Sequence, residues 1–204
     1  MSARVSRRRR LPPEERSRQI IEAVTQVVAE HGVSGATVAR IAAAAKVSEG
    51  TLYVYYPSRK EMLRAALDGI FTRMAALIDA APQMSADEML RDIARRHSEV
   101  MKTERDRFTS PWIEFVVAGP QVGLREAVTE TQAKAFAKML KIIEQGQAEG
   151  VIRDDIDAKR LTWQFYTILW AENLSTLMGL TEYIDEGHSN YSLELMLKDA
   201  AGSP

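Results

Sequence analysis

The sequence contains no cysteine among its 204 residues. Disulfide bonds, cysteine-ligated zinc and thiol catalysis are therefore excluded. Its three histidines, His31, His97 and His188, are scattered, and none has a second ligand three or four residues away. We therefore expect no metal site and no cofactor.

Long apolar runs are also missing, and no apolar stretch follows the basic residues at the N-terminus. These absences argue against a membrane span and against a secretory signal. The sequence also lacks G-x-S-x-G, H-E-x-x-H and P-loop patterns, which carry common catalytic chemistries. We therefore predict a cytoplasmic protein that is not an enzyme and has no membrane partner.

Charge is distributed unevenly along the chain. Residues 1–64 hold twelve Lys or Arg against six Asp or Glu, whereas the other 140 residues hold fifteen against twenty-two. A basic amino-terminal part on an acidic body predicts that the first part meets a polyanion. The run Arg7–Arg10 is either an arm that lies along a DNA groove or a solvated tail.

Apolar residues recur at helical spacing almost throughout, without convincing two-residue alternation, which predicts an all-α fold of about nine helices. Caps, prolines and glycines place these helices near residues 14–32, 37–45, 48–56, 58–81, 85–103, 110–119, 121–149, 158–178 and 190–200. Ser58 with Glu61 and Ser85 with Glu88 form capping boxes, and Ser110 is the expected N-cap of its helix.

Two short helices joined by a turn are expected between residues 37 and 56. The second of them and the start of the following helix lie in residues 48–63, SEGTLYVYYPSRKEML. In a basic segment this arrangement favours helix-turn-helix DNA recognition. At about 100° per residue, Leu52 and Tyr56 share the inward face, Tyr55 lies on its flank and Tyr53 points outward.

Each of these positions suits a different contact with a duplex. Gly50 removes side-chain bulk where a backbone approaches closely. Thr51, Tyr53 and Val54 are candidates for base edges or a thymine methyl group. Tyr55 can pack its ring inward and donate its hydroxyl to a phosphate.

The stretch TVARIAAAAKVSEGTLYVYYPSRKEML resembles the DNA-binding signature of TetR-family transcriptional regulators, over about residues 15–65. The resemblance implies a homodimer with an amino-terminal helix-turn-helix and a divergent helical ligand-binding domain. It also implies phosphate contacts at Thr37, Thr51, Tyr55 and Lys60. Glu49 departs from the family pattern, where Lys or Arg is common, and Val54 replaces a larger residue. The candidate DNA-binding residues are Thr37, Arg40, Ser48, Glu49, Gly50, Thr51, Tyr53, Val54, Tyr55 and Lys60.

Bulky apolar residues are frequent in the carboxyl-terminal body, and some are expected to line a cavity. The candidates for a ligand pocket are Phe71, Met74, Phe108, Trp112, Phe115, Phe136, Met139, Trp163 and Tyr166. The 158–178 helix carries two apolar stripes and so needs two neighbours. We expect the second neighbour to be the partner subunit, with Trp170, Leu174 and Leu177 in the dimer interface.

The sequence therefore predicts a basic arm at residues 1–12, a helix-turn-helix domain at 13–60 and a ligand-binding and dimerisation domain at 61–204. The expected function is a homodimeric repressor that a small-molecule effector releases from double-stranded operator DNA. Three alternatives stay open: a constitutive or partner-regulated regulator without an effector, an activator, and a helical enzyme with a basic end.

Overall fold

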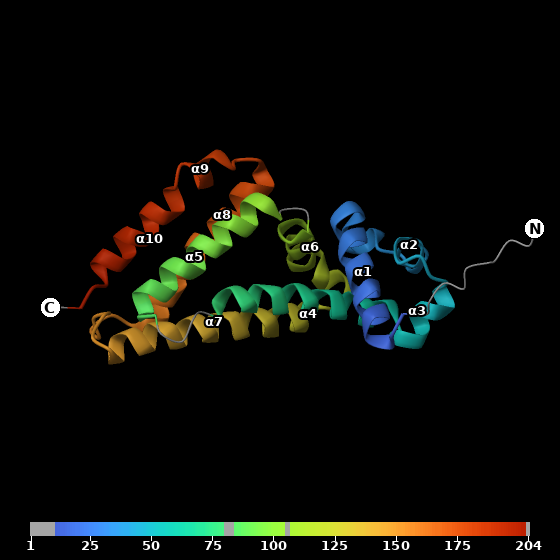
Figure 1. Ribbon diagram of the computed structural model, residues 1–204, viewed down its shortest axis with the longest axis horizontal. Coiled ribbons are helices and arrows are strands. Elements are labelled where there is room, and N and C mark those ends of the chain that lie inside the picture. Colours follow the sequence, from blue (N-terminus) through green and yellow to red (C-terminus); the bar gives the residue numbers. More distant parts are fainter. Residues whose placement is uncertain (1–10, 80–83, 105–106, 203–204) are drawn as a thin grey trace, which may run out of the picture.

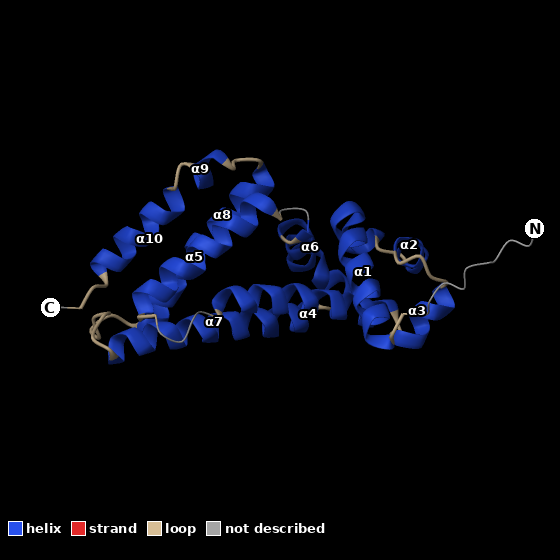
Figure 2. Ribbon diagram, in the orientation of Figure 1, coloured by secondary structure: helices blue, strands red, loops and turns tan. Residues whose placement is uncertain are grey.

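The computed structural model describes residues 11–79, 84–104 and 107–202, so the arginine run and the end of the expected 58–81 helix lie outside the described residues. Within these ranges the chain forms ten α-helices and one 3₁₀ helix, joined by loops (Figures 1 and 2). The elements are α1 (Pro13–Gly35), α2 (Val38–Ala44), α3 (Glu49–Tyr55), α4 (Arg59–Ile78), α5 (Ala86–Thr103), α6 (Thr109–Ala118), η2 (Gly119–Val122), α7 (Arg125–Ala148), α8 (Ala158–Met178), α9 (Glu182–Asp185) and α10 (His188–Asp199). None of the helices in the described part is long and apolar enough to cross a membrane.

Local capping signals set the starts of four helices. The side chains of Thr37, Ser48, Ser58 and Asp157 each accept a hydrogen bond from a backbone N–H in the first turn that follows. Each bond satisfies a donor that a helix start otherwise leaves unpaired. The predicted starts of α2, α3, α4 and α8 are confirmed.

One N-cap, one helix start and one short helix differ from the expectation. Phe108 rather than Ser110 is the N-cap of α6. The helix predicted from residue 121 begins at Arg125, because η2 precedes it and Gly123 has a φ of 74° that interrupts helical geometry. The four-residue helix α9 was not predicted, since so short an element shows no period.

The helices divide the molecule into two ends. Figure 1 shows α1, α2 and α3 together at the amino-terminal end, and α5, α8 and α10 at the other. Helices α4 and α7 pack side by side along the long axis between them, and α1 packs against both α4 and α6. Helices α4 and α6 therefore belong to the body while touching the amino-terminal helices.

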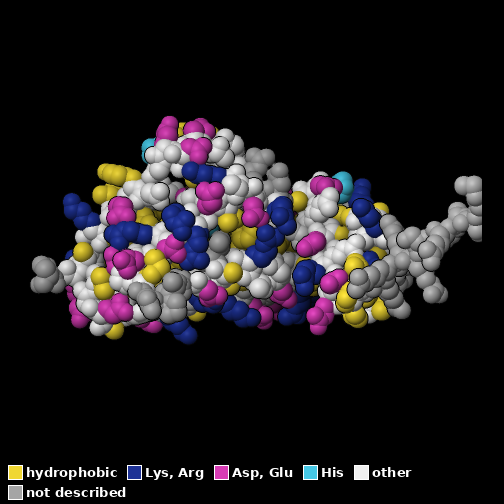
Figure 3. All heavy atoms as spheres, viewed as in Figure 1, with side chains coloured by type: hydrophobic (Ala, Val, Ile, Leu, Met, Phe, Trp, Pro, Cys, Tyr) yellow, Lys and Arg dark blue, Asp and Glu magenta, His cyan; other side chains and the backbone are white. Residues whose placement is uncertain are grey.

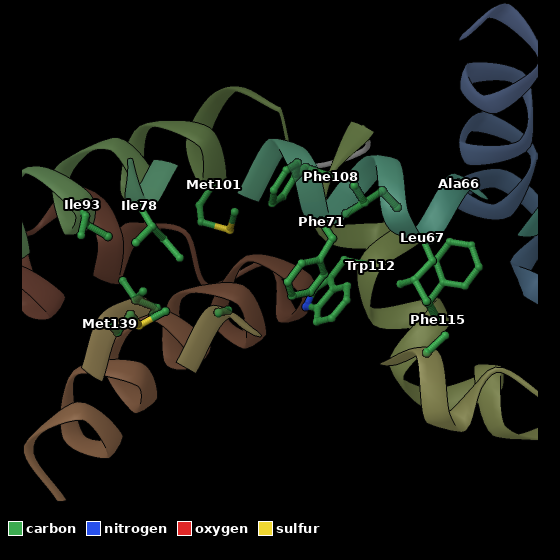
Figure 4. Close-up of a cluster of buried hydrophobic side chains, with 14 of the residues drawn as sticks. Ala66, Leu67, Phe71, Ile78, Ile93, Met101, Phe108, Trp112, Phe115 and Met139 are labelled. Carbon is green, nitrogen blue, oxygen red and sulfur yellow. The ribbon is translucent and has the colours of Figure 1, made fainter. Parts of the chain in front are cut away.

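Buried apolar side chains pack α4 against α6. Figure 4 shows Leu67 and Phe71 of α4 beside Trp112 and Phe115 of α6, all of them buried. The rings of Phe71 and Trp112 meet edge to face, with centroids 5.7 Å apart. Because close-packed interiors transmit displacement, a change at these rings reaches both helices.

Candidate DNA-binding face and ligand cavity

Helices α2 and α3 form the expected helix-turn-helix pair. The turn between them passes through Lys46, which has a φ of 54°, and Val47 N–H donates to Ala42 O at 3.0 Å. Leu52 is fully buried beneath α3 and fixes its inward face. The opposite face of α3 is thereby held toward solvent.

The outward face of α3 combines exposed side chains with an exposed glycine. Tyr53 is 49% exposed and Val54 80% exposed, and apolar side chains reach the surface at this end of the molecule (Figure 3). A Cβ built at Gly50 would have only Ser48 Oγ, 3.9 Å away, within 4 Å among the described residues. Packing within the chain therefore does not require this glycine, and the space above it is open to another molecule.

The tyrosines of α3 and its C-cap occupy different environments. Tyr53 points to solvent, whereas Tyr55 and Tyr56 are half-buried against the core. The Tyr56 hydroxyl lies 2.7 Å from Ser17 Oγ of α1. Tyr56 therefore ties the end of α3 to α1, as its inward position on the helical wheel predicted.

Several polar candidates are ordered by bonds within this domain. Thr37 and Ser48 cap their helices, and Ser48 Oγ lies 2.9 Å from Thr51 Oγ1. Arg40 Nη1 donates to Gly35 O at 2.8 Å, which holds its side chain against the end of α1. These exposed or half-exposed groups are therefore held in place by hydrogen bonds within the chain.

Charged groups near α3 are mixed. Glu49 is exposed in the first turn of α3. Lys60 is also exposed, but its Nζ would lie 3.2 Å from a Cβ built at Gly123, so this side chain leans toward the body. The open hollow beside α3 is bordered by Arg16 and Lys46, two basic residues that the sequence analysis did not select.

An apolar cavity of about 30 Å³ lies among α4, α5, α6, α7 and α8. This volume admits no more than about two water molecules. Five of the predicted pocket residues line it, namely Phe71, Met74, Trp112, Met139 and Tyr166. Burial in this wall raises the pKa of the Tyr166 hydroxyl.

Four other predicted pocket residues do not line this cavity. Phe108 and Phe115 are buried elsewhere in the core. Phe136 and Trp163 border a separate, shallow surface hollow, and Trp163 is 60% exposed. Helical periodicity assigns residues to faces, but tertiary packing decides which faces enclose a space.

The second apolar stripe of α8 divides between two environments. Trp170 lines the cavity and its ring packs near those of Trp112 and Tyr166, so it does not lie on the outer face. Leu174 and Leu177 are exposed. Exposed apolar residues on α8 and α10 are Trp163, Leu174, Leu177, Met178, Tyr191 and Leu195, and we call this set the α8–α10 apolar face.

A buried polar cluster, absent from the predicted sites, lies beside the cavity. His97 Nδ1 lies 2.7 Å from Glu172 Oε2, and Ser98 Oγ donates to Glu172 Oε1 at 2.6 Å. Burial raises the pKa of Glu172, but the hydrogen bonds from His97 and Ser98 outweigh it, so this pKa lies below its ordinary value. A signal existed in the sequence: a carboxylate and an amide, Glu172 and Asn173, lie on the same buried face of α8 as Leu161, Phe165 and Leu169.

Two contacts join the body to the end of α1. Glu114 of α6 accepts a hydrogen bond from Val33 N–H at 3.3 Å, beside Gly32, whose φ is 68°. Arg59, the first residue of α4, donates from Nε to Ala36 O at 2.7 Å. Helices α4 and α6 each line the cavity and each bond to the segment that leads into α2.

A helix-turn-helix whose second helix exposes one face is typical of helix-turn-helix DNA-binding regulators. Residues 20–66 match the family described as "Bacterial regulatory proteins, tetR family". An HTH-type transcriptional repressor from Streptomyces coelicolor is 26% identical over 152 residues, which cover 73% of each chain.

Solved structures share the fold over most of the chain. A TetR-family transcriptional regulator from a Rhodococcus species superposes with a TM-score of 0.76 at 24% identity and covers 90% of this chain and 99% of its own. The regulator FadR from Bacillus subtilis, solved in complex with stearoyl-CoA, has a TM-score of 0.65 at 22% identity and covers 88% of this chain and 97% of its own. The present chain therefore carries the amino-terminal DNA-binding domain of the tetR family at residues 20–66, on a helical body that shares the fold of such regulators.

Proposed function

We propose that this chain is a homodimeric repressor that binds double-stranded operator DNA through α3 and leaves it when a small molecule occupies the cavity. Its place of action would be the cytoplasm, where the operator lies. The outward face of α3 carries the DNA-binding part of the proposal, because Gly50, Tyr53 and Val54 are exposed there. The repressor named among the relatives supports the sign of regulation.

A second copy of the chain is the proposed occupant of the α8–α10 apolar face. On a helical wheel the four α8 members fall within about 100° of one another, so they form one stripe. A two-fold dimer through this stripe presents the two α3 helices to successive major grooves, about 34–36 Å apart or a multiple of that. A symmetric protein of this kind matches a palindromic operator.

Occupancy of the cavity is proposed to act through α4 and α6. Phe71 of α4 and Trp112 of α6 line the cavity, and its volume of about 30 Å³ is smaller than any effector of more than a few atoms. Such an effector would therefore separate these helices. Because Arg59 and Glu114 bond to the end of α1, the separation would move the helix-turn-helix domain and change the distance between the two α3 helices.

The effector binds the state in which these helices are apart, so it shifts the population away from the DNA-competent state. The complex of the Bacillus subtilis regulator with stearoyl-CoA supports a small-molecule effector for a protein of this fold. The stearoyl-CoA itself is a property of that regulator.

In vitro transcription from the DNA upstream of the gene tests the sign of regulation. We expect the wild type to reduce transcript yield, Tyr53→Ala to lose this effect, and Val117→Ala to retain it, because Val117 is exposed on α6 away from α3. An increase in transcript would establish an activator instead. Unchanged transcript with the wild type would contradict the proposed repression.

A further inference from the structure

One wall of the cavity is polar, and its hydrogen bonds can be assigned completely. Asn173 Nδ2 donates to Leu169 O at 2.9 Å and lies 3.1 Å from His97 Nε2. The Leu169 carbonyl can only accept, so it fixes the orientation of the Asn173 amide. His97 Nε2 must then accept from the second Nδ2 hydrogen, and His97 Nδ1 donates to Glu172.

This assignment leaves one polar atom of Asn173 without a hydrogen bond. Both Nδ2 hydrogens of Asn173 are used, whereas its Oδ1 is buried and has no hydrogen-bond partner among the described residues. Asn173 is 2% exposed and lines the cavity. A buried carbonyl oxygen without a partner is costly, and so it favours any occupant that donates a hydrogen bond.

The remaining wall defines the body of that occupant. The rings of Phe71, Trp112, Tyr166 and Trp170 surround the space. An anion in this space would be repelled by the carboxylate of Glu172, which is buried directly behind His97. The pKa of this carboxyl group lies below its ordinary value. A carboxylate ligand would also bring no hydrogen for Asn173 Oδ1.

We propose that the cavity takes an uncharged, mainly aromatic or alicyclic molecule that donates one hydroxyl or N–H hydrogen bond to Asn173 Oδ1. This inference rests on the proposed function, since it names the class of effector for the same cavity. It assigns Asn173 as the residue that determines specificity, with Leu169, His97 and Glu172 holding its amide in place.

Three single-ring probes with the same ethyl group separate donor, acceptor and acid: 4-ethylphenol, 4-ethylanisole and 4-ethylbenzoate. Isothermal titration calorimetry on the full-length wild type should show 4-ethylphenol binding at least about tenfold more tightly than 4-ethylanisole, with 4-ethylbenzoate the weakest. The ratio of phenol to anisole affinity should fall toward one in Asn173→Leu. It should persist in Val117→Ala, which alters an exposed residue of α6 that does not line the cavity.

The wild-type series alone can overturn the inference, whether or not Asn173→Leu folds. Equal binding of the phenol and the anisole would mean that water, rather than a ligand, satisfies Asn173 Oδ1. Tightest binding of the benzoate would reverse the inferred charge preference. Binding by none of the three would show that the cavity does not open to admit a single ring.

A parallel measurement of operator affinity separates this inference from the proposed function. If 4-ethylphenol binds selectively and operator affinity is unchanged, the ligand class stands and release by cavity occupancy fails. If all three probes release the operator equally, release stands and the donor preference fails.

Discussion

Replacing Gly50 with alanine should separate folding from DNA binding. Gly50 lies in the first turn of α3, and it is not among the glycines with positive φ. Its added Cβ would have Ser48 Oγ at 3.9 Å as its nearest neighbour among the described residues, so no atom must move. Alanine also loses less backbone entropy than glycine in a helix, and the gain is at most about 1 kcal/mol.

The two expected effects have opposite signs. A stabilisation of about 1 kcal/mol would raise the melting temperature by roughly 2–4 °C in a chain of this size. The same methyl group stands where the backbone of α3 is proposed to approach the duplex. We expect operator affinity to fall at least about tenfold, which is about 1.4 kcal/mol. Thermal melting and fluorescence anisotropy on the same sample measure both.

Gly119→Ala provides the matched control. Gly119 has a φ of −52°, and a Cβ there would meet Val128 Cγ2 at 3.5 Å, which is ordinary contact. It lies after α6, away from α3, so this variant should bind operator like the wild type. Wild-type affinity in Gly50→Ala, or a lower melting temperature, would refute the reasoning.

Three further variants test other parts of the structure. Tyr56→Phe removes the hydrogen bond to Ser17 and should lower the free energy of unfolding, measured by urea titration, by about 1 kcal/mol. Operator affinity should stay the same, and a loss of affinity would mean that Tyr56 contacts DNA. Because the folded-state pKa of Glu172 is lowered from 4.5, its stabilisation exists above that value and is lost as the pH falls through the folded pKa. As the pH falls from about 6 to 3, the free energy of unfolding should therefore decrease less in Glu172→Gln than in the wild type. Parallel profiles of unfolding free energy against pH for the two proteins would contradict this. In analytical ultracentrifugation Leu174→Glu should sediment as a monomer, whereas the control Val117→Glu should remain a dimer, because Val117 is 67% exposed on α6. A dimeric Leu174→Glu would exclude the α8–α10 apolar face as the dimer interface.

Helix starts could be predicted where the residue that determines them lies within one turn of the start. Thr37, Ser48 and Ser58 each act within one helical turn, so their roles as N-caps are readable from neighbouring residues. The turn at Gly123 and the short helix α9 depend on context beyond one turn, and their boundaries were missed.

The candidate sites divide in the same way. The outward direction of Tyr53 follows from helix geometry alone. His97 and Glu172 are 75 positions apart, and only tertiary packing brings them together. Trp170 and Leu174 share a stripe on the helical wheel, yet one faces the cavity and the other solvent, because the neighbouring helices cover one end of the stripe.

The dependence of operator affinity on the state of the cavity is the central claim, and it can be measured without knowing the effector. Ala135 of α7 is buried and lines the cavity, whereas Ala133 of the same helix is exposed. Ala135→Phe fills the space permanently, at a cost in stability of about 1–3 kcal/mol, and Ala133→Phe adds the same group to the surface. Fluorescence anisotropy on the upstream duplex, at a temperature where both variants are folded, should show operator affinity at least about tenfold weaker for Ala135→Phe than for Ala133→Phe. Equal affinity would contradict the claim that cavity occupancy controls DNA binding.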